Sequence, residues 1–262
     1  MGKNKELQKN KSRLHLLDTV RGLAIIGMVF IHVTYDLPEY FGIYPAYADS
    51  LWYEIFGQLV RITFIFLSGY CAMLGKKTLK RGLIVSGAGL LVTLVSVIAK
   101  VNPPIYFGVL TLIGACMLLS VPLKKVITKK NAAVFMITGI LLFILTLHLY
   151  NGYFGFVGHP FFYWPSWFYQ GNNPVLLYPL AFLGFPGGMF SSSDYFPLIP
   201  WFFLFLSGMS FYALFGETLK KKDLMKIKAE PLAFLGRYSL WVYLLHQPLI
   251  MGILMAIAAV RR

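Results

Sequence analysis

The chain has 262 residues, of which 58% are hydrophobic and 13% charged, and its formal net charge is +14. About a quarter of the residues in a soluble domain are charged, so this composition excludes an ordinary soluble globular protein. The 24 Lys and Arg residues lie in clusters between long apolar runs. That distribution is typical of cytoplasmic loops in membrane proteins and argues against nucleic acid as a partner.

Seven apolar runs are each long enough to cross a hydrocarbon layer of about 30 Å as a helix. They cover residues 15–36, 51–75, 82–99, 105–122, 132–150, 197–215 and 232–257. An eighth apolar stretch, 175–190, is short and contains Pro179 and Pro186, so we expect a re-entrant or interfacial segment there. The sequence therefore predicts an all-α fold, a polytopic membrane bundle of about seven transmembrane helices.

The basic clusters also predict an orientation. They lie before the first run and after the second, fourth and sixth runs, whereas 37–50 and 151–196 contain no Lys or Arg. Basic loops stay in the cytoplasm, so we expect a cytoplasmic N-terminus and an integral protein of the inner membrane of a bacterium. We expect residues 1–14 to form a basic cytoplasmic segment and 15–258 a single membrane domain. The aromatic outer loop 151–196 indicates either a belt at the lipid headgroups or a lid over a substrate.

The first predicted span carries an aligned set of ionisable residues. At 100° per residue, Asp18, Arg21, His32 and Asp36 fall within an arc of about 60° on one helix face. We expect Asp36 to hold the imidazole of His32, four residues away, and Asp18 to pair with Arg21. Intramembrane ionisable groups usually face a cavity or a partner.

Two further spans carry polar stripes. Arg61 lies in the middle of the second span, with Glu54 near its face, so Arg61 either pairs with Glu54 or awaits an anionic ligand. Tyr243 and His246 share a face of the last span, and Gln247 follows them. Three polar stripes predict a polar slot in the bundle. A small-residue face around Thr111 in the fourth span would allow close approach of backbone or ligand.

A histidine oriented by a carboxylate, in a slot that contains arginines, suits general-base activation of a hydroxyl or amine. The arginines would hold phosphate groups of a donor. The sequence has no hydrolase elbow, Walker loop or metal-binding motif, and we assign no metal. The same buried groups would also serve a transporter or exporter of a small polar or lipid-linked substrate, so the residues leave both classes open.

Five blocks of the sequence resemble one family. They are LLDTVRGLAIIGMVFIHVTYDL (16–37), FIFLSGY (64–70), YFGVLTLIG (106–114), DYFPLIPWFFLFLSG (194–208) and LGRYSLWVYLLHQPLI (235–250). In this order they are similar to bacterial membrane proteins with a heparan-alpha-glucosaminide N-acetyltransferase-type catalytic domain. Arg21 and His32 also match a pattern of the related acyltransferase-3 family, an arginine and a histidine separated by ten residues.

The resemblance implies an acyl-CoA-dependent acyltransferase. Acetyl-CoA or another acyl-CoA would approach from the cytoplasm, and a sugar or glycolipid of the cell envelope would accept the acyl group on the outer side. His32 would be the base, assisted by Asp36. The resemblance also implies Arg21 as a donor-side contact and Asp194, His246 and Gln247 as residues that line the site. We add Asp18 and Arg61 as donor-binding candidates, and Thr111, Tyr195 and Tyr243 as substrate-binding candidates beside Asp194, His246 and Gln247. Membrane lipids are expected partners, and the sequence is compatible with a homo-oligomer. Many relatives have histidine at the position of Thr111, which would imply a different acceptor or impaired activity here.

Overall fold

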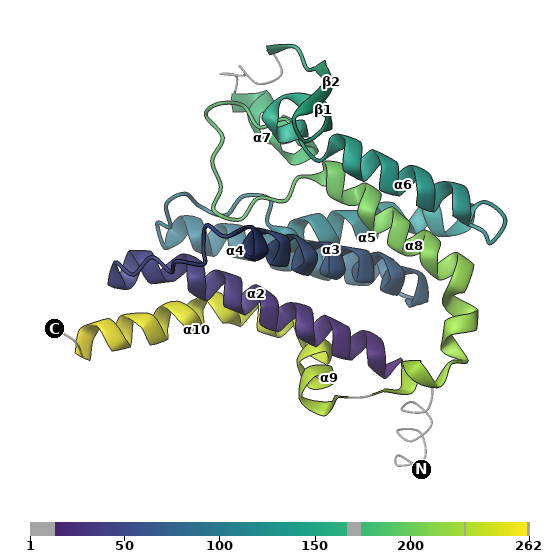
Figure 1. Cartoon of the computed structure of the whole chain (residues 1–262), viewed down its shortest axis with the longest axis horizontal. Helices are drawn as coiled ribbons and strands as arrows, with labels where there is room; N and C mark the ends of the chain where they lie inside the picture. The colour runs from purple at the N-terminus through teal and green to yellow at the C-terminus, as the bar shows by residue number, and fades with distance from the viewer. Residues whose placement is uncertain (1–13, 167–173, 228, 261–262) are drawn as a thin grey trace. The chain divides into compact units, whose positions relative to one another are not determined.

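Most of the described residues lie in helices. The structure, a computed structural model, describes residues 14–166, 174–227 and 229–260 (Figure 1). The helices of the described residues are α2 (His15–Phe41), α3 (Leu51–Leu74), α4 (Thr78–Ile98), α5 (Val109–Val126), α6 (Ala132–Thr146), α7 (Pro174–Leu183), α8 (Leu198–Lys220), α9 (Glu230–Arg237) and α10 (Ser239–Val260). Short 3-10 turns lie at Leu149–Asn151 and Asp223–Lys226.

Seven of the described helices are long and apolar enough to cross a membrane, which agrees with the predicted number. Several boundaries differ from the sequence prediction, among them those of the last and the first runs. The last predicted run, 232–257, contains two helices, because the chain leaves helical geometry at Tyr238 between α9 and α10. The first helix continues through Pro38 to Phe41, where Gly42 in the left-handed conformation ends it and donates its N–H to the Pro38 carbonyl.

The eighth apolar stretch forms the ten-residue helix α7, which is about 15 Å long and too short to span a bilayer. The loop 151–196 also contains a two-stranded antiparallel hairpin, β1 (Tyr153–Phe156) and β2 (His159–Tyr163), which sequence reasoning did not predict. Part of that loop, residues 167–173, lies outside the described residues, as do most of the basic segment 1–14, Lys228 and the last two arginines.

The chain divides into two compact units. Unit 1 combines Met1–Phe64 with Glu217–Arg262, so that α2 packs against α9 and α10. Glycines allow the contact between α2 and α9, because a Cβ on Gly22 would meet the carbonyl of Leu232 and a Cβ on Gly236 would meet the carbonyl of Asp18. Figure 1 shows the yellow α10 lying beside the purple α2.

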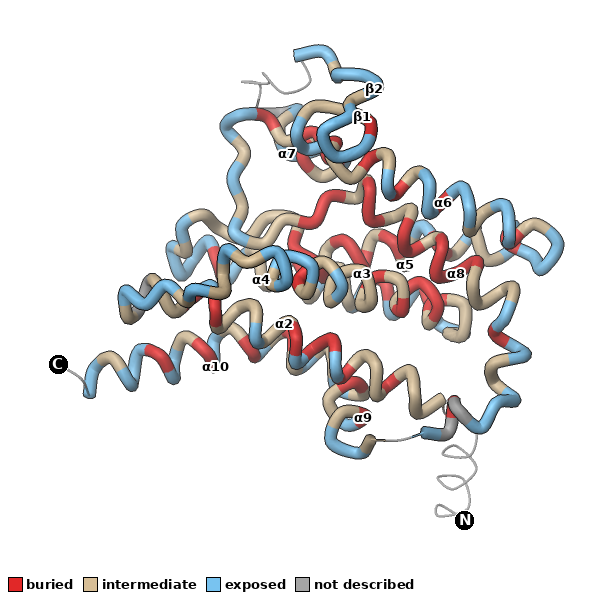
Figure 2. Tube along the Cα trace, viewed as in Figure 1, coloured by how far each residue is buried: buried red, intermediate tan, exposed pale blue. Residues whose placement is uncertain are grey.

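Unit 2 is Ile65–Gly216, and its buried residues concentrate along α5 and α8, which Figure 2 shows in red. The tightest pair is α4 with α5. At the basic end of this pair, Nζ of Lys124 on α5 donates to the Gly75 carbonyl over 2.7 Å and to the hydroxyl of Thr78. These hydrogen bonds of Lys124 therefore connect the end of α5 to the turn at the start of α4.

Candidate functional site

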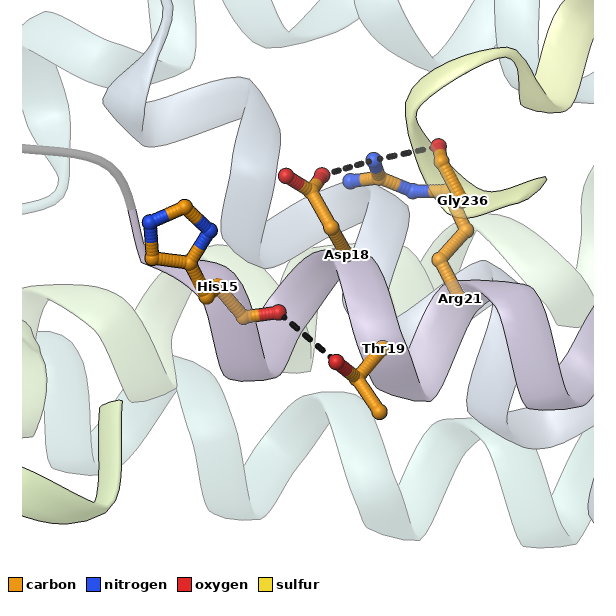
Figure 3. Close-up of polar contacts among 5 residues, drawn as sticks. All are labelled: His15, Asp18, Thr19, Arg21 and Gly236. Atoms are coloured by element: carbon orange, nitrogen blue, oxygen red, sulfur yellow. Dashed lines mark hydrogen bonds and ion pairs between the residues drawn. The ribbon is translucent and has the colours of Figure 1, made fainter. Parts of the chain in front are cut away.

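The polar stripe of α2 begins with an ion pair at its first turns. Arg21 Nη1 lies 3.2 Å from Oδ1 of Asp18, which confirms the expected pair, and the same nitrogen donates to the Gly236 carbonyl over 3.2 Å. Figure 3 shows Arg21 extending from α2 toward Gly236 with the Asp18 carboxylate beside it. Asp18 is buried, being 6% exposed. The pair therefore joins α2 to the end of α9, in addition to any contact with a ligand.

The expected hydrogen bond between His32 and Asp36 is replaced by two others. Nδ1 of His32 lies 2.9 Å from the carbonyl oxygen of Met28, one turn back on α2. Oδ2 of Asp36 accepts from Nε2 of Gln247 on α10 over 2.8 Å. The prediction failed because helical spacing brings two side chains near each other but does not exclude backbone carbonyls or residues of another helix as partners.

The contact with Met28 determines the tautomer of His32. A carbonyl oxygen only accepts hydrogen bonds, so Nδ1 must carry the proton, and the neutral imidazole has its lone pair on Nε2. His32 is half-buried. Its Nε2 is therefore the atom that can take a proton from a bound group.

His246 on α10 repeats this arrangement beside His32. Its Nδ1 lies 2.6 Å from the Tyr243 carbonyl, so its lone pair is also on Nε2. The two imidazole rings lie edge to face, with centroids 4.8 Å apart and planes at 85°. His246 Nε2 and Gln247 Oε1 are buried and have no hydrogen-bond partner among the described residues. Sequence reasoning placed His246 on a polar face but gave no sign that it contacts His32.

Arg61, also in unit 1, is oriented by its own helix. Its Nε donates to the Gly57 carbonyl over 3.1 Å, and an Nη atom lies 3.2 Å from the place where a Cβ on Gly57 would stand. The Gly57 carbonyl thus accepts a hydrogen bond from Arg61, for which we had considered Glu54 as a partner. Glu54 is exposed.

The remaining predicted residues belong to unit 2. The Asp194 carboxylate lies against Gly108, which precedes α5, where the partial positive charge of the helix N-terminus favours an anion. Ser192 holds this loop, because its hydroxyl accepts from the Tyr106 N–H over 2.9 Å and donates its single proton to the Tyr106 carbonyl over 2.9 Å, with the Asp194 carbonyl 3.2 Å away as a second acceptor. A hydrogen bond with Tyr178 raises the pKa of Tyr106.

Two of these residues have structural contacts of their own. The Tyr195 hydroxyl donates to the Ala181 carbonyl and so anchors α7. Thr111 lies on the face of α5 that meets α4, where a Cβ on Gly89 would stand 2.6 Å from the Thr111 hydroxyl. The predicted close approach at this small-residue face is thus a helix–helix contact.

Comparison with known families identifies a match over most of the chain. The family model described as heparan-alpha-glucosaminide N-acetyltransferase, catalytic, matches residues 13–248. No curated protein and no solved structure matches the chain. The matched range includes both histidines, Asp36, Gln247 and the arginines of the candidate site.

Proposed function

Because the chain belongs to the family of heparan-alpha-glucosaminide N-acetyltransferase catalytic domains, we propose that it is a membrane-integral acyltransferase. The family's name describes transfer of an acetyl group to the nitrogen of an amino sugar. For this chain we propose acetyl-CoA or another acyl-CoA as donor and a hydroxyl or amine of an envelope sugar or glycolipid as acceptor.

The observation that carries the proposal is the hydrogen bond from Nδ1 of His32 to the Met28 carbonyl. It leaves Nε2 of a half-buried histidine as a proton acceptor within a membrane-spanning helix. An ionisable side chain is costly there and usually marks a functional site. A general base needs this tautomer and a fixed ring, and the carbonyl supplies both.

The proposed reaction is direct. The acceptor oxygen or nitrogen attacks the thioester carbonyl carbon, and its proton moves to Nε2 of His32. The new C–O or C–N bond forms as the C–S bond breaks, and the thiolate of CoA then takes a proton to become the thiol. His32 ends the cycle neutral, and no oxidant or reductant is needed.

We further propose that the donor enters from the cytoplasm, with the N-terminus on that side. The basic loops support this orientation. Arg21 lies eleven residues before His32 in α2, a rise of about 16 Å. An arginine at this depth would hold a phosphate of CoA while the thioester reaches the histidine, and Asp18 would keep its guanidinium oriented.

The test is CoA release by the purified protein in lipid nanodiscs, followed by mass spectrometry with acetyl-CoA and a panel of amino sugars and sugars. We expect acceptor-dependent CoA release and an acylated product, with a loss of at least about 100-fold in His32→Gln. His159→Gln, which changes an exposed histidine of the β1–β2 hairpin, is the matched control and should retain activity.

Two results would count against the proposal. One is equal activity in His32→Gln and the control. The other is accumulation of substrate in vesicles without consumption of acetyl-CoA, which would favour the transporter class.

A further inference from the structure

The proposed reaction places a positive charge on His32, and the structure gives this charge an unusual neighbour. In many enzymes a carboxylate stabilises the imidazolium of the base. Here the nearby carboxylate, that of Asp36, accepts a hydrogen bond from the side-chain amide of Gln247. The ring that lies directly against His32 is that of His246, with centroids 4.8 Å apart.

His246 is prepared to receive a hydrogen bond. Its Nδ1 donates to the Tyr243 carbonyl over 2.6 Å, which leaves the Nε2 lone pair as an acceptor. This nitrogen is buried and has no hydrogen-bond partner among the described residues, and His246 as a whole is only 7% exposed. A buried acceptor without a donor is unfavourable, so the site is better satisfied when a donor reaches it.

We propose that His32 and His246 share the proton that the reaction releases. This inference rests on the proposed function. The proton leaves the acceptor's O–H or N–H bond for Nε2 of His32, and Nε2 of His246 then accepts a hydrogen bond or the proton itself. The proton finally passes to the sulfur of the departing CoA thiolate, so both rings return to the neutral state. His246 thus acts through His32, as a positioning residue for the transferred proton.

The short distance between the two rings favours one shared proton over two charged rings. Two imidazolium ions at this separation would repel each other strongly in a membrane-spanning segment. Among the described residues, Asp36, which is hydrogen-bonded to the adjacent Gln247, and Tyr243, whose ring lies 5.2 Å from that of His246, are ionisable side chains close to the pair. The pair therefore holds the proton without requiring the Asp36 carboxylate to contact His32.

The decisive variant is His246→Gln, because glutamine offers an acceptor oxygen but cannot take a proton. We expect kcat to fall about 10- to 100-fold, with KM for the acceptor sugar changed by less than about 3-fold. His159→Gln is again the control and should behave as wild type.

Two results would overturn the proposal: an unchanged kcat in His246→Gln, or an increase in KM alone. The last would assign His246 to binding of the acceptor. If the variant does not fold, nitrogen-15 NMR of labelled histidines in wild type and His32→Gln replaces it.

In that measurement the Nε2 signal of His246 should change when His32 becomes protonated, and this change should be absent in His32→Gln. Identical behaviour of His246 in both proteins would refute the pair. Because this readout needs no catalysis, it separates failure of the pair from failure of the acyltransferase proposal.

Discussion

Gln247 donates to Asp36 over 2.8 Å and so connects α10 to α2 one residue from His246 and four residues from His32. Asp36 is buried, with 8% of its surface exposed. A hydrogen bond to a buried carboxylate is among the stronger polar contacts in a protein. The contact fixes the position of α10 along α2, so that His246 lies opposite His32.

We predict that Gln247→Leu lowers the free energy of unfolding by about 1.5–3 kcal/mol, because the buried carboxylate loses its amide donor. Asp36→Asn retains an acceptor oxygen and should cost less. The loss in the double variant should be smaller than the sum of the single losses. Denaturation of the purified protein in detergent measures all three, with Asp49→Asn, an exposed carboxylate, as the control. Additive losses would contradict a direct bond.

A second prediction concerns the contact between α2 and α9. Gly236→Ala should destabilise unit 1 by about 1–3 kcal/mol and weaken the hold of Arg21, because the new Cβ meets the Asp18 carbonyl. Gly252→Ala on α10 is the matched control, since nothing lies within 4 Å of its Cβ position. Thermal unfolding distinguishes them. Equal unfolding temperatures in the two variants would show that the helices do not meet at Gly236.

Adjacent lysines in α5 provide a third prediction. Lys124→Gln should lower the free energy of unfolding by about 1–2 kcal/mol, since Lys124 donates to Gly75 and Thr78, whereas Lys125→Gln, an exposed neighbour, should change it by less than about 0.5 kcal/mol. Both substitutions remove one positive charge, so a difference reports the contact rather than the charge. If both variants have the same free energy of unfolding, the hydrogen bonds of Lys124 to Gly75 and Thr78 do not contribute to stability.

A fourth prediction tests the loop that carries Asp194. Ser192→Ala should cost about 1–2 kcal/mol, because the Tyr106 N–H loses its acceptor and the Tyr106 carbonyl loses its donor. Ser193→Ala, at an exposed position, should be nearly neutral. Hydrogen exchange at Tyr106 provides the direct measurement, with faster exchange expected only in the first variant. Unchanged protection there would remove Ser192 as the residue that holds the loop.

The sequence predicted the helices well because apolar length alone decides which segments can cross a membrane. It also predicted the pair of Asp18 and Arg21, since both partners lie on one helix three residues apart. It missed the break at Tyr238, because an apolar run does not reveal where the backbone changes direction.

The contact between His32 and His246 was beyond sequence reasoning for a different reason. The two residues are 214 positions apart. Helical periodicity indicates which face of a helix carries each residue, but not which helix packs against that face or at which level along it. The partner of Asp36 was missed in the same way, because Gln247 comes from another helix.

The contact of Thr111 with Gly89 limits the size of the side chain that fits at position 111. The backbones of α4 and α5 meet there, and Thr111 occupies the gap that the missing side chain of Gly89 provides. A histidine at 111 would need more volume than this gap offers, so it would either turn its ring away from α4 or force the two helices apart. Replacing the threonine by histidine would therefore change the spacing of α4 and α5 as well as the chemistry of the position.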